Sequence, residues 1–201
     1  RSSAAVLMRV FPMVFPPGIP LVIYVRLVWT NMPGFNHRRQ FFTERRRSAL
    51  DHEYYMEQAL LLAREAARAG EVPVGCVIVR GGEIVGRGRN RREEKQATCS
   101  HAEMEAIREA NRALGSWRLE DCTLYVTLEP CPMCAGAILS ARIPRVYYGA
   151  RDRAMGACGG VLNLYMEPFA LTPALVGGIL ADECRAVLEN FFRGIRADKL
   201  P

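Results

Sequence analysis

Two short motifs in this chain combine side chains that can bind a metal ion and move protons. The first places a histidine and a glutamate two positions apart, His101 and Glu103, and the second, Pro-Cys-Pro-Met-Cys, contains Cys131 and Cys134. Thiolate sulfur and imidazole nitrogen are preferred ligands of zinc. His101, Cys131 and Cys134 are therefore candidate zinc ligands, and three protein ligands leave a fourth position for water, which is typical of a catalytic site.

The elements that must position these ligands are two helices. Apolar periodicity predicts helices over residues 102–114 and 132–140, so each motif stands at a helix start. Pro132 suits the first helical position, and a spacing of three residues places both sulfurs on one helix face. The positive end of the helix dipole would stabilise the thiolates.

Glu103 is the candidate acid–base residue. It shares one stripe of its predicted helix with Ile107, Ala110 and Leu114, so we expect it to point into the protein. A buried carboxylate is normally paired or functional, and beside a zinc site it can shuttle protons. A lone C-x-x-C, histidine or inward glutamate has a purely structural explanation, but the two motifs together match the known signature of zinc-dependent nucleobase deaminases.

The chain from Asp51 onward predicts an α/β domain. A β-hairpin that turns at Gly81-Gly82 and a strand–helix–strand unit over residues 123–149, which requires parallel pairing, indicate a layered α/β fold. The other predicted elements are a helix from Asp51 as N-cap to Ala69, strands Val72–Arg80, Glu83–Arg89, Thr123–Thr127 and Arg145–Gly149, and a final helix Ala181–Arg193.

The net charge of +6 is unevenly distributed along the 201 residues. Residues 1–47 contain eight arginines and one acid, Glu44, and so carry +7, whereas residues 48–201 carry −1. The overall charge therefore gives no support for nucleic-acid binding by the body of the protein. Seven cysteines are too few, and odd in number, for a disulfide scaffold, so we expect reduced thiols in a cytosol-like compartment. The cysteines expected to be small buried side chains are Cys76, Cys122, Cys158 and Cys184.

Residues 1–47 form a predicted irregular extension. Their apolar stretch, residues 10–25, contains four prolines. A membrane-spanning helix needs about 20 apolar residues with few helix breakers, so we expect no membrane span. Three origins stay open for this segment: a non-native upstream translation, a targeting peptide, or a basic arm that contacts a membrane surface or RNA.

Runs of sequence around the two motifs resemble one family of zinc deaminases. From Asp51 to Arg196 the sequence resembles the bacterial tRNA-specific adenosine deaminases, within the cytidine-deaminase-like superfamily. The zinc motifs alone would fit any member of that superfamily, whereas the flanking runs are specific to the family. The matching runs are Glu71–Gly75, Thr123–Cys131, Cys134–Ala137, Tyr148–Asp152, Gly178–Cys184 and Phe191–Arg193.

The resemblance implies a fold and an activity. The fold would be an α/β, three-layer α/β/α sandwich around a mostly parallel five-stranded sheet, formed by a zinc-dependent deaminase domain over residues 48–201. The activity would be hydrolytic deamination of adenosine to inosine at the wobble position of a tRNA anticodon. His101, Cys131 and Cys134 would bind one Zn²⁺ per subunit, whose hydroxide attacks C6 of adenine, with Glu103 as the catalytic proton shuttle.

The resemblance also implies substrate contacts and partners. Asn90 would hydrogen-bond the flipped nucleoside, Val72 and Val74 would wall the base pocket, and Asp152, with Arg151 beside it, would contact the backbone of the RNA loop. The partners would be a tRNA anticodon stem-loop and a second copy of the chain in a homodimer. The enzyme would be cytoplasmic and would not contact a membrane.

Three groups of basic residues are candidate RNA contacts. Each group alone could equally be a solvated charged face. Two of the groups lie near Asn90 or Asp152 in the sequence, which favours a rim that contacts RNA phosphates. The groups are Arg87, Arg89, Arg91 and Arg92; Arg142, Arg145, Arg151 and Arg153; and Arg193, Arg196 and Lys199.

Three other functions stay open. A free-base or nucleoside deaminase would use the same zinc residues but would need a closed pocket without an RNA rim. A catalytically silent RNA-binding subunit should lack the glutamate that this chain has at Glu103. A purely structural zinc module would need a fourth ligand, for which Cys99 is the nearest candidate, next to Ser100, where the family usually has a small apolar residue.

Overall fold

The computed structural model describes the backbone of residues 37–197 and the side chains of residues 51–197. Most of the predicted extension, residues 1–36, lies outside the described residues. The chain divides between Arg46 and Arg47 into two units, and the second contains the sheet and every helix after α2. The description that follows concerns this second unit.

Five strands form one mixed sheet in the order β2-β1-β3-β4-β5. β1 is antiparallel to both of its neighbours, whereas β3, β4 and β5 pair in parallel. Four strands therefore point one way and β1 points the other way. The prediction of a mostly parallel sheet holds for strand direction, but two of the four pairings are antiparallel. The strands are β1 Gly75–Arg80, β2 Glu83–Arg89, β3 Cys122–Leu128, β4 Arg145–Ala150 and β5 Ala174–Gly177.

The antiparallel part of the sheet follows from the predicted hairpin turn. Gly81 and Gly82 connect β1 to β2 with φ values of 58° and 90°. Glycine adopts this left-handed region without steric cost, and a two-residue turn with two positive φ angles matches the twist of antiparallel strands. A turn of this length cannot make a parallel crossover, which needs a dozen or more residues.

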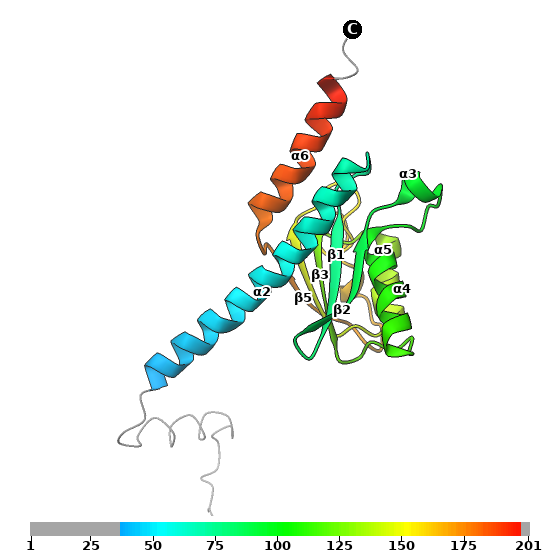
Figure 1. Cartoon of the computed structure of the whole chain (residues 1–201). Coiled ribbons are helices and arrows are strands. Elements are labelled where there is room, and N and C mark those ends of the chain that lie inside the picture. The colour runs from blue at the N-terminus through cyan, green and yellow to red at the C-terminus, as the bar shows by residue number, and fades with distance from the viewer. Residues whose placement is uncertain (1–36, 198–201) are drawn as a thin grey trace, which may run out of the picture. The chain divides into compact units, whose positions relative to one another are not determined.

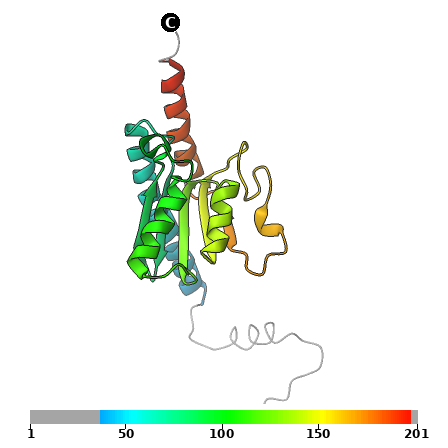
Figure 2. The same ribbon diagram turned by 90° about the vertical axis from the view of Figure 1, so that its right-hand side faces the viewer.

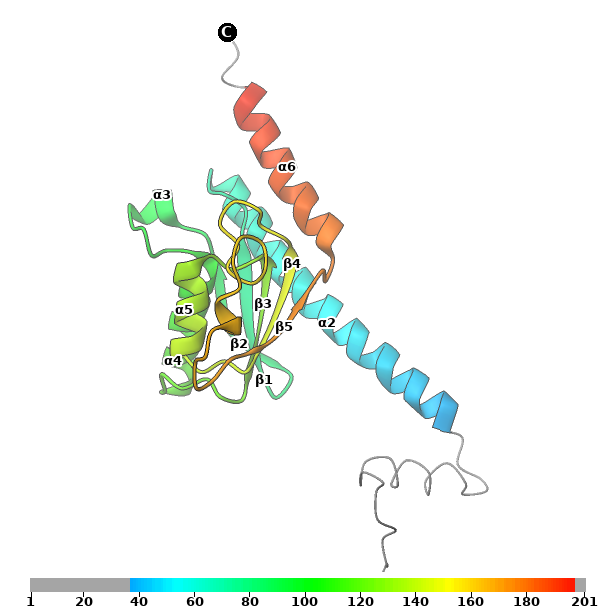
Figure 3. The same ribbon diagram turned by 180° about the vertical axis from the view of Figure 1, so that it is seen from behind.

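Helices cover both faces of the sheet, which confirms the predicted three-layer sandwich. α4 (Ala102–Leu114) and α5 (Pro132–Ser140) lie on one face of the sheet (Figures 1 and 3). The other face is covered by α6 (Ala181–Ala197) and by the part of α2 (His37–Arg68) that belongs to the second unit. Figure 2 shows α4 and α5 side by side against the sheet. The two faces have separate apolar cores, because Ile78 of β1 packs with the α4 side and Val77 packs with the α2 side.

Two glycines of β2 let α4 approach the sheet closely. A Cβ atom at Gly88 would lie 2.0 Å from the carbonyl oxygen of Ala102, and one at Gly86 would lie 2.4 Å from that of Ala106. Both distances are far inside van der Waals contact, so only glycine permits this packing. The first turn of α4, which follows His101, is thereby held against β2.

One helix start and three short elements differ from the sequence prediction. α2 begins at His37, so Asp51 lies inside the helix and is not its N-cap. No proline or glycine occurs between residues 37 and 68, so nothing in the sequence interrupts the helix, and residues 37–47 of the predicted irregular extension are helical. The elements not predicted are α3 (Arg92–Lys95), the 3₁₀ turn η1 (Leu164–Met166) and β5, each of four residues or fewer.

The remaining predicted elements are present. The bounds of α4, α5 and β2 are those predicted, β1 begins at Gly75 and not at Val72, and α6 continues to Ala197. The cysteines predicted to be small buried side chains are buried free thiols: Cys76, Cys122, Cys158 and Cys184.

Candidate metal centre and active site

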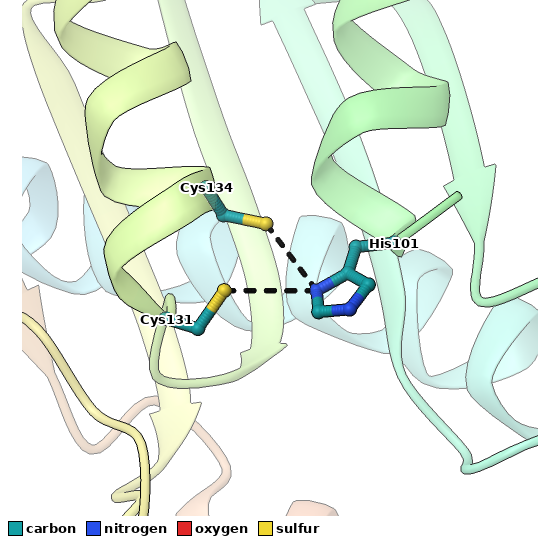
Figure 4. A group of neighbouring side chains, drawn as sticks. All are labelled: His101, Cys131 and Cys134. Atoms are coloured by element: carbon teal, nitrogen blue, oxygen red, sulfur yellow. Dashed lines mark hydrogen bonds between the residues drawn. The ribbon is translucent and has the colours of Figure 1, made fainter. Parts of the chain in front are cut away.

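The three candidate zinc ligands lie at the starts of two neighbouring helices. His101 directly precedes α4, Cys131 directly precedes α5, and Cys134 is in the first turn of α5. His101 and Cys131 both have extended backbone with ψ near 157° and 171°, which turns each side chain toward the gap between the helix ends. Figure 4 shows both sulfurs directed at the imidazole ring.

The distances between these ligand atoms fit zinc. The Nδ1 atom of His101 lies 3.6 Å from the Cys131 sulfur and 3.5 Å from the Cys134 sulfur (Figure 4). Zinc–sulfur and zinc–nitrogen bonds of about 2.3 and 2.0 Å at a tetrahedral angle place such atoms roughly 3.6 Å apart. Two sulfurs and one imidazole nitrogen are also the donor set that zinc prefers. The residues present therefore fit a three-ligand zinc site.

Cys99 does not complete a four-ligand site. Its side chain is exposed, and the group of possible metal ligands found among residues 51–197 contains only His101, Cys131 and Cys134. A purely structural zinc module would need a fourth ligand that Cys99 does not supply. The three-ligand arrangement agrees with a catalytic site.

The two cysteines of the centre titrate as a pair. A hydrogen bond from Cys134, helped by one from His101, lowers the pKa of Cys131 to about 4 although burial opposes the shift. The same hydrogen bond to Cys131, together with burial, raises the pKa of Cys134. The hydrogen bond with Cys131 also raises the pKa of His101. One thiol therefore ionises readily, and the second holds its proton until a cation takes the place of that proton.

Glu103 lies in the first turn of α4, two residues after His101, and is only 4 % exposed. Burial raises the pKa of its carboxyl to about 7. A carboxyl group with a pKa near neutrality can both accept and return a proton, which is what a general acid–base residue must do. The prediction that Glu103 points inward is confirmed.

A cleft of about 530 Å³ opens beside the metal centre. Its lining includes His101, Cys131 and Glu103, and a cleft of this size can hold one nucleoside. The predicted substrate residues also line it: Val72, Val74, Asn90, Arg151 and Asp152. Arg92, a candidate RNA contact, lines it as well. The sequence did not point to the other lining residues, which are Ala102, Leu128, Glu129, Ala154, Met155, Leu188 and Phe192.

One wall of the cleft depends on the buried carboxylate of Glu71. It accepts a hydrogen bond from the Asn90 side-chain amide at 3.3 Å and another from the backbone N–H of Glu94 at 2.8 Å. Glu71 thus joins the segment before β1 to the end of β2 and to α3. Glu71 belongs to the run Glu71–Gly75 that resembles the deaminase family, but the sequence does not indicate its role, because its hydrogen-bond partners lie about 20 residues away.

A second part of the cleft wall depends on another buried carboxylate, Glu129. It accepts the backbone N–H groups of Asp152, Cys158 and Gly160 at 3.1, 2.9 and 2.7 Å. These bonds shape the loop after β4, which carries the lining residues Asp152 and Met155. These contacts make Glu129 a structural residue of the cleft.

The family of this chain follows from comparison with known proteins. Residues 50–150 match the model of the cytidine and deoxycytidylate deaminase zinc-binding region. The tRNA-specific adenosine deaminase of Bacillus subtilis strain 168 is 49 % identical over 148 residues, which cover 73 % of this chain and 92 % of that protein. The chain belongs to the tRNA-specific adenosine deaminases.

Other members of the tRNA-specific adenosine deaminases agree with this assignment. The enzyme of Streptococcus pyogenes serotype M1 is 46 % identical over 153 residues, 74 % of this chain and 88 % of that protein. A solved structure from a study of A-to-I editing by tRNA:A34 deaminases at the wobble position of transfer RNA has a TM-score of 0.65. It is 43 % identical in sequence and covers 67 % of this chain and 99 % of that one.

The basic groups of this adenosine deaminase differ in their surroundings. Arg92 and Arg151 line the cleft, whereas Arg89 and Arg91 are paired with Glu94. In the second group, Arg142 forms an ion pair with Glu120 at 2.9 Å and Arg145 bonds to Thr123 at 3.1 Å. Arg142 and Glu120 line a different hollow of the surface. Arg151 also has partners, because it donates to the Gly159 carbonyl and lies 4.0 Å from a Glu129 carboxylate oxygen. The RNA-facing interpretation is thus supported best for Arg92, while the paired arginines agree with a solvated face.

Proposed function

We propose that this chain deaminates adenosine to inosine at the wobble position of a tRNA anticodon. The observation that carries the proposal is the buried Glu103 beside three zinc-ligand atoms in a cleft of about 530 Å³. The relatives named for this reaction align over the same residues, at 49 and 46 % identity.

His101, Cys131 and Cys134 would hold the metal. Zinc, when bound there, acts as a Lewis acid that makes water a nucleophile near neutral pH. Glu103 would accept one proton of the attacking water and deliver it to N1 of adenine. It would then carry the second proton, from the hydroxyl formed at C6, to the departing amino group, which leaves as ammonia while the C6 carbonyl of inosine forms. Burial raises the pKa of this carboxyl to about 7, which suits proton transfer in both directions near neutral pH.

The remaining lining residues would bind the flipped nucleotide and its neighbours. Val72 and Val74 would contact the base, and Asn90 would hydrogen-bond the nucleoside. Asp152 and Arg151 stand on the loop after β4 and would contact the backbone of the anticodon loop. An unpaired loop base costs less to extrude than a paired one, which favours an anticodon substrate.

A homodimer in the cytoplasm is the proposed state of the enzyme. Several large apolar side chains are exposed in one segment, as expected for a face that a second copy covers. Among the described residues, no helix has the length and apolar character needed to cross a membrane. Sedimentation at micromolar concentration tests the dimer, and a monomer alone would contradict it. The exposed side chains are Val161, Leu162, Met166, Phe169, Leu171 and Val176.

The chemistry is proposed to belong to residues 48–201. All the lining residues of the cleft come from residue 72 onward. A chain that begins at Ser48 should therefore bind zinc and deaminate a saturating stem-loop like the full chain. A zinc-loaded protein that has lost more than about tenfold in turnover would assign part of the active machinery to residues 1–47.

The test of the proposed reaction uses zinc-loaded protein and an anticodon stem-loop with adenosine at the wobble position. Inosine should form there, with little product from free adenosine, cytidine or guanine. Comparable turnover of a free base or nucleoside would assign the chain to the small-substrate deaminases. No product from any of these substrates, with zinc bound, would contradict a catalytic role.

A further inference from the structure

Asn90 has one paired and one unpaired side-chain atom. Its Nδ2 atom donates to Glu71 at 3.3 Å, and both residues are more than nine-tenths buried. Its Oδ1 atom is also buried, yet it has no hydrogen-bond partner among the described residues. Asn90 is one of the residues that line the cleft, so this unpaired acceptor belongs to the cleft wall.

The contacts of Glu71 determine which atom of the Asn90 amide faces the cleft. The Glu71 carboxylate accepts the Glu94 backbone N–H at 2.8 Å with one oxygen and faces Asn90 with the other. A carboxylate offers only acceptors, so the NH₂ group of Asn90 must point toward it. If the amide were reversed, Asn90 Oδ1 would face the Glu71 carboxylate, and both groups are acceptors. The NH₂ group of Asn90 would then lose its hydrogen bond to Glu71.

We propose that Glu71 is a positioning residue that holds Asn90 as the hydrogen-bond acceptor for the 2′-hydroxyl of the target nucleotide. The inference rests on the proposed function, because it assumes an adenosine within an RNA strand. Such a nucleotide has only two donor groups, the N6 amine and the 2′-hydroxyl. The amine is the leaving group and must face Glu103 and the zinc ligands, so the 2′-hydroxyl remains as the partner of Asn90 Oδ1.

Substitution of Glu71 should change which hydrogen-bonding group of the Asn90 side chain faces the cleft. In Glu71→Gln, the side-chain oxygen can keep the Glu94 N–H only if its NH₂ group faces Asn90. The Asn90 amide would then turn, pairing its oxygen with the glutamine and directing its NH₂ group into the cleft. The cleft would offer a donor in place of an acceptor.

The experiment compares two stem-loops that differ only at the target nucleotide, with a 2′-hydroxyl or a 2′-fluoro group. Fluorine keeps a ribose-like sugar pucker but cannot donate a hydrogen bond. The parent enzyme should lose roughly tenfold in kcat/KM on the fluoro substrate, because a buried acceptor is left unpaired. In Glu71→Gln the penalty should shrink to within about twofold, because an NH₂ group can meet either oxygen or fluorine.

Two controls keep the result interpretable. Glu120→Gln makes the same chemical change at an exposed residue outside the cleft, paired with Arg142, and should retain the parent's fluoro penalty. Asn90→Ala removes the acceptor and should abolish the penalty, which tests the inference even if Glu71→Gln does not fold. Zinc content and thermal melting are measured for each variant.

Each part of the proposal has a result that would contradict it. No fluoro penalty in the parent would overturn the assignment of the 2′-hydroxyl, and so would a penalty that persists in Asn90→Ala. A folded Glu71→Gln that is slower on both substrates with an unchanged ratio would reduce Glu71 to a structural residue. A zinc-loaded parent that deaminates neither stem-loop would contradict the proposed function itself.

Discussion

The zinc ligands and the substrate-facing walls of the cleft are positioned by different kinds of structure. The ligands stand at the starts of α4 and α5, and each helix start is specified by residues within a few positions of the ligand. The walls depend on Glu71 and Glu129, whose hydrogen bonds join segments about 20 to 30 residues apart. Because the two kinds of structure are independent, we expect that the walls can be loosened while the metal centre stays intact.

The largest expected effect is loss of the metal centre itself. Cys134→Ser removes a buried ligand, so we expect zinc binding and nearly all deamination to disappear. Structural zinc contributes roughly 10–16 kcal/mol of binding energy in small peptides, so stability should fall as well. Metal analysis, melting and turnover test this, with the exposed Cys99→Ser as a control that should behave like the parent. Full zinc and full activity in Cys134→Ser would refute the ligand set.

The next effect separates metal binding from chemistry. Glu103→Gln keeps the size of the side chain and leaves all three ligands, so we expect zinc content and melting to change little. Turnover should fall roughly 100- to 10,000-fold, because a positioned acid–base group has been removed. Single-turnover deamination of the stem-loop measures this loss. If the rate stays within a few-fold of the parent, Glu103 is not the proton shuttle.

A third substitution should change only the part of the cleft wall that Glu129 holds, which is the loop after β4. A Cβ atom at Gly160 would lie 2.0 Å from the Asp152 carbonyl oxygen and 2.6 Å from a Glu129 oxygen, so Gly160→Ala must displace the loop. Overpacking of this kind costs about 1–3 kcal/mol, and we expect KM for the stem-loop to rise roughly tenfold with zinc unchanged. Steady-state kinetics and metal analysis test this. Gly194→Ala, where a Cβ meets nothing within 4 Å, should leave KM as in the parent. A loss of zinc in Gly160→Ala would show that the walls and the centre are not separable.

The smallest effect concerns a residue outside both regions. His52 of α2 bonds to the Tyr125 hydroxyl at 2.8 Å and stacks on Tyr147 with ring centroids 4.2 Å apart. Burial lowers the pKa of His52 below 6.5, although Asp51 opposes the shift. The unfolded chain therefore binds this proton more tightly, so the contribution of His52 is present above pH 6.5 and is lost as the pH falls below that value.

Unfolding at pH 7 and pH 5 measures this contribution. The contribution of His52 to the free energy of unfolding should be less than about 1 kcal/mol, because solvent largely screens its ring. His52→Gln should flatten the pH dependence of stability without changing zinc content or KM. If the free energy of unfolding of His52→Gln depends on pH as it does in the parent, His52 does not take up a proton on unfolding between pH 5 and pH 7.

The parts of the protein that depend on nearby residues can be predicted from the amino-acid sequence. Helices over 102–114 and 132–140 were predicted with their observed bounds, because proline placement and apolar periodicity act within a few turns. The two-glycine turn determined the hairpin of β1 and β2 in the same way. The zinc ligands were found since a metal motif at a helix start is itself a local pattern.

The contacts that join distant segments cannot be predicted from the sequence, because they form only when the chain is folded. Leu188 and Phe192 have the spacing of an apolar helix face, but only the packing of α6 brings them to the cleft lining. β5 has four residues and no recognisable pattern, so it is defined by its pairing with β4. Glu71 and Glu129 read as ordinary charged residues in the sequence. Their roles exist because burial removes water as a partner, and each carboxylate must then bond to whichever backbone and side-chain donors the fold brings within reach.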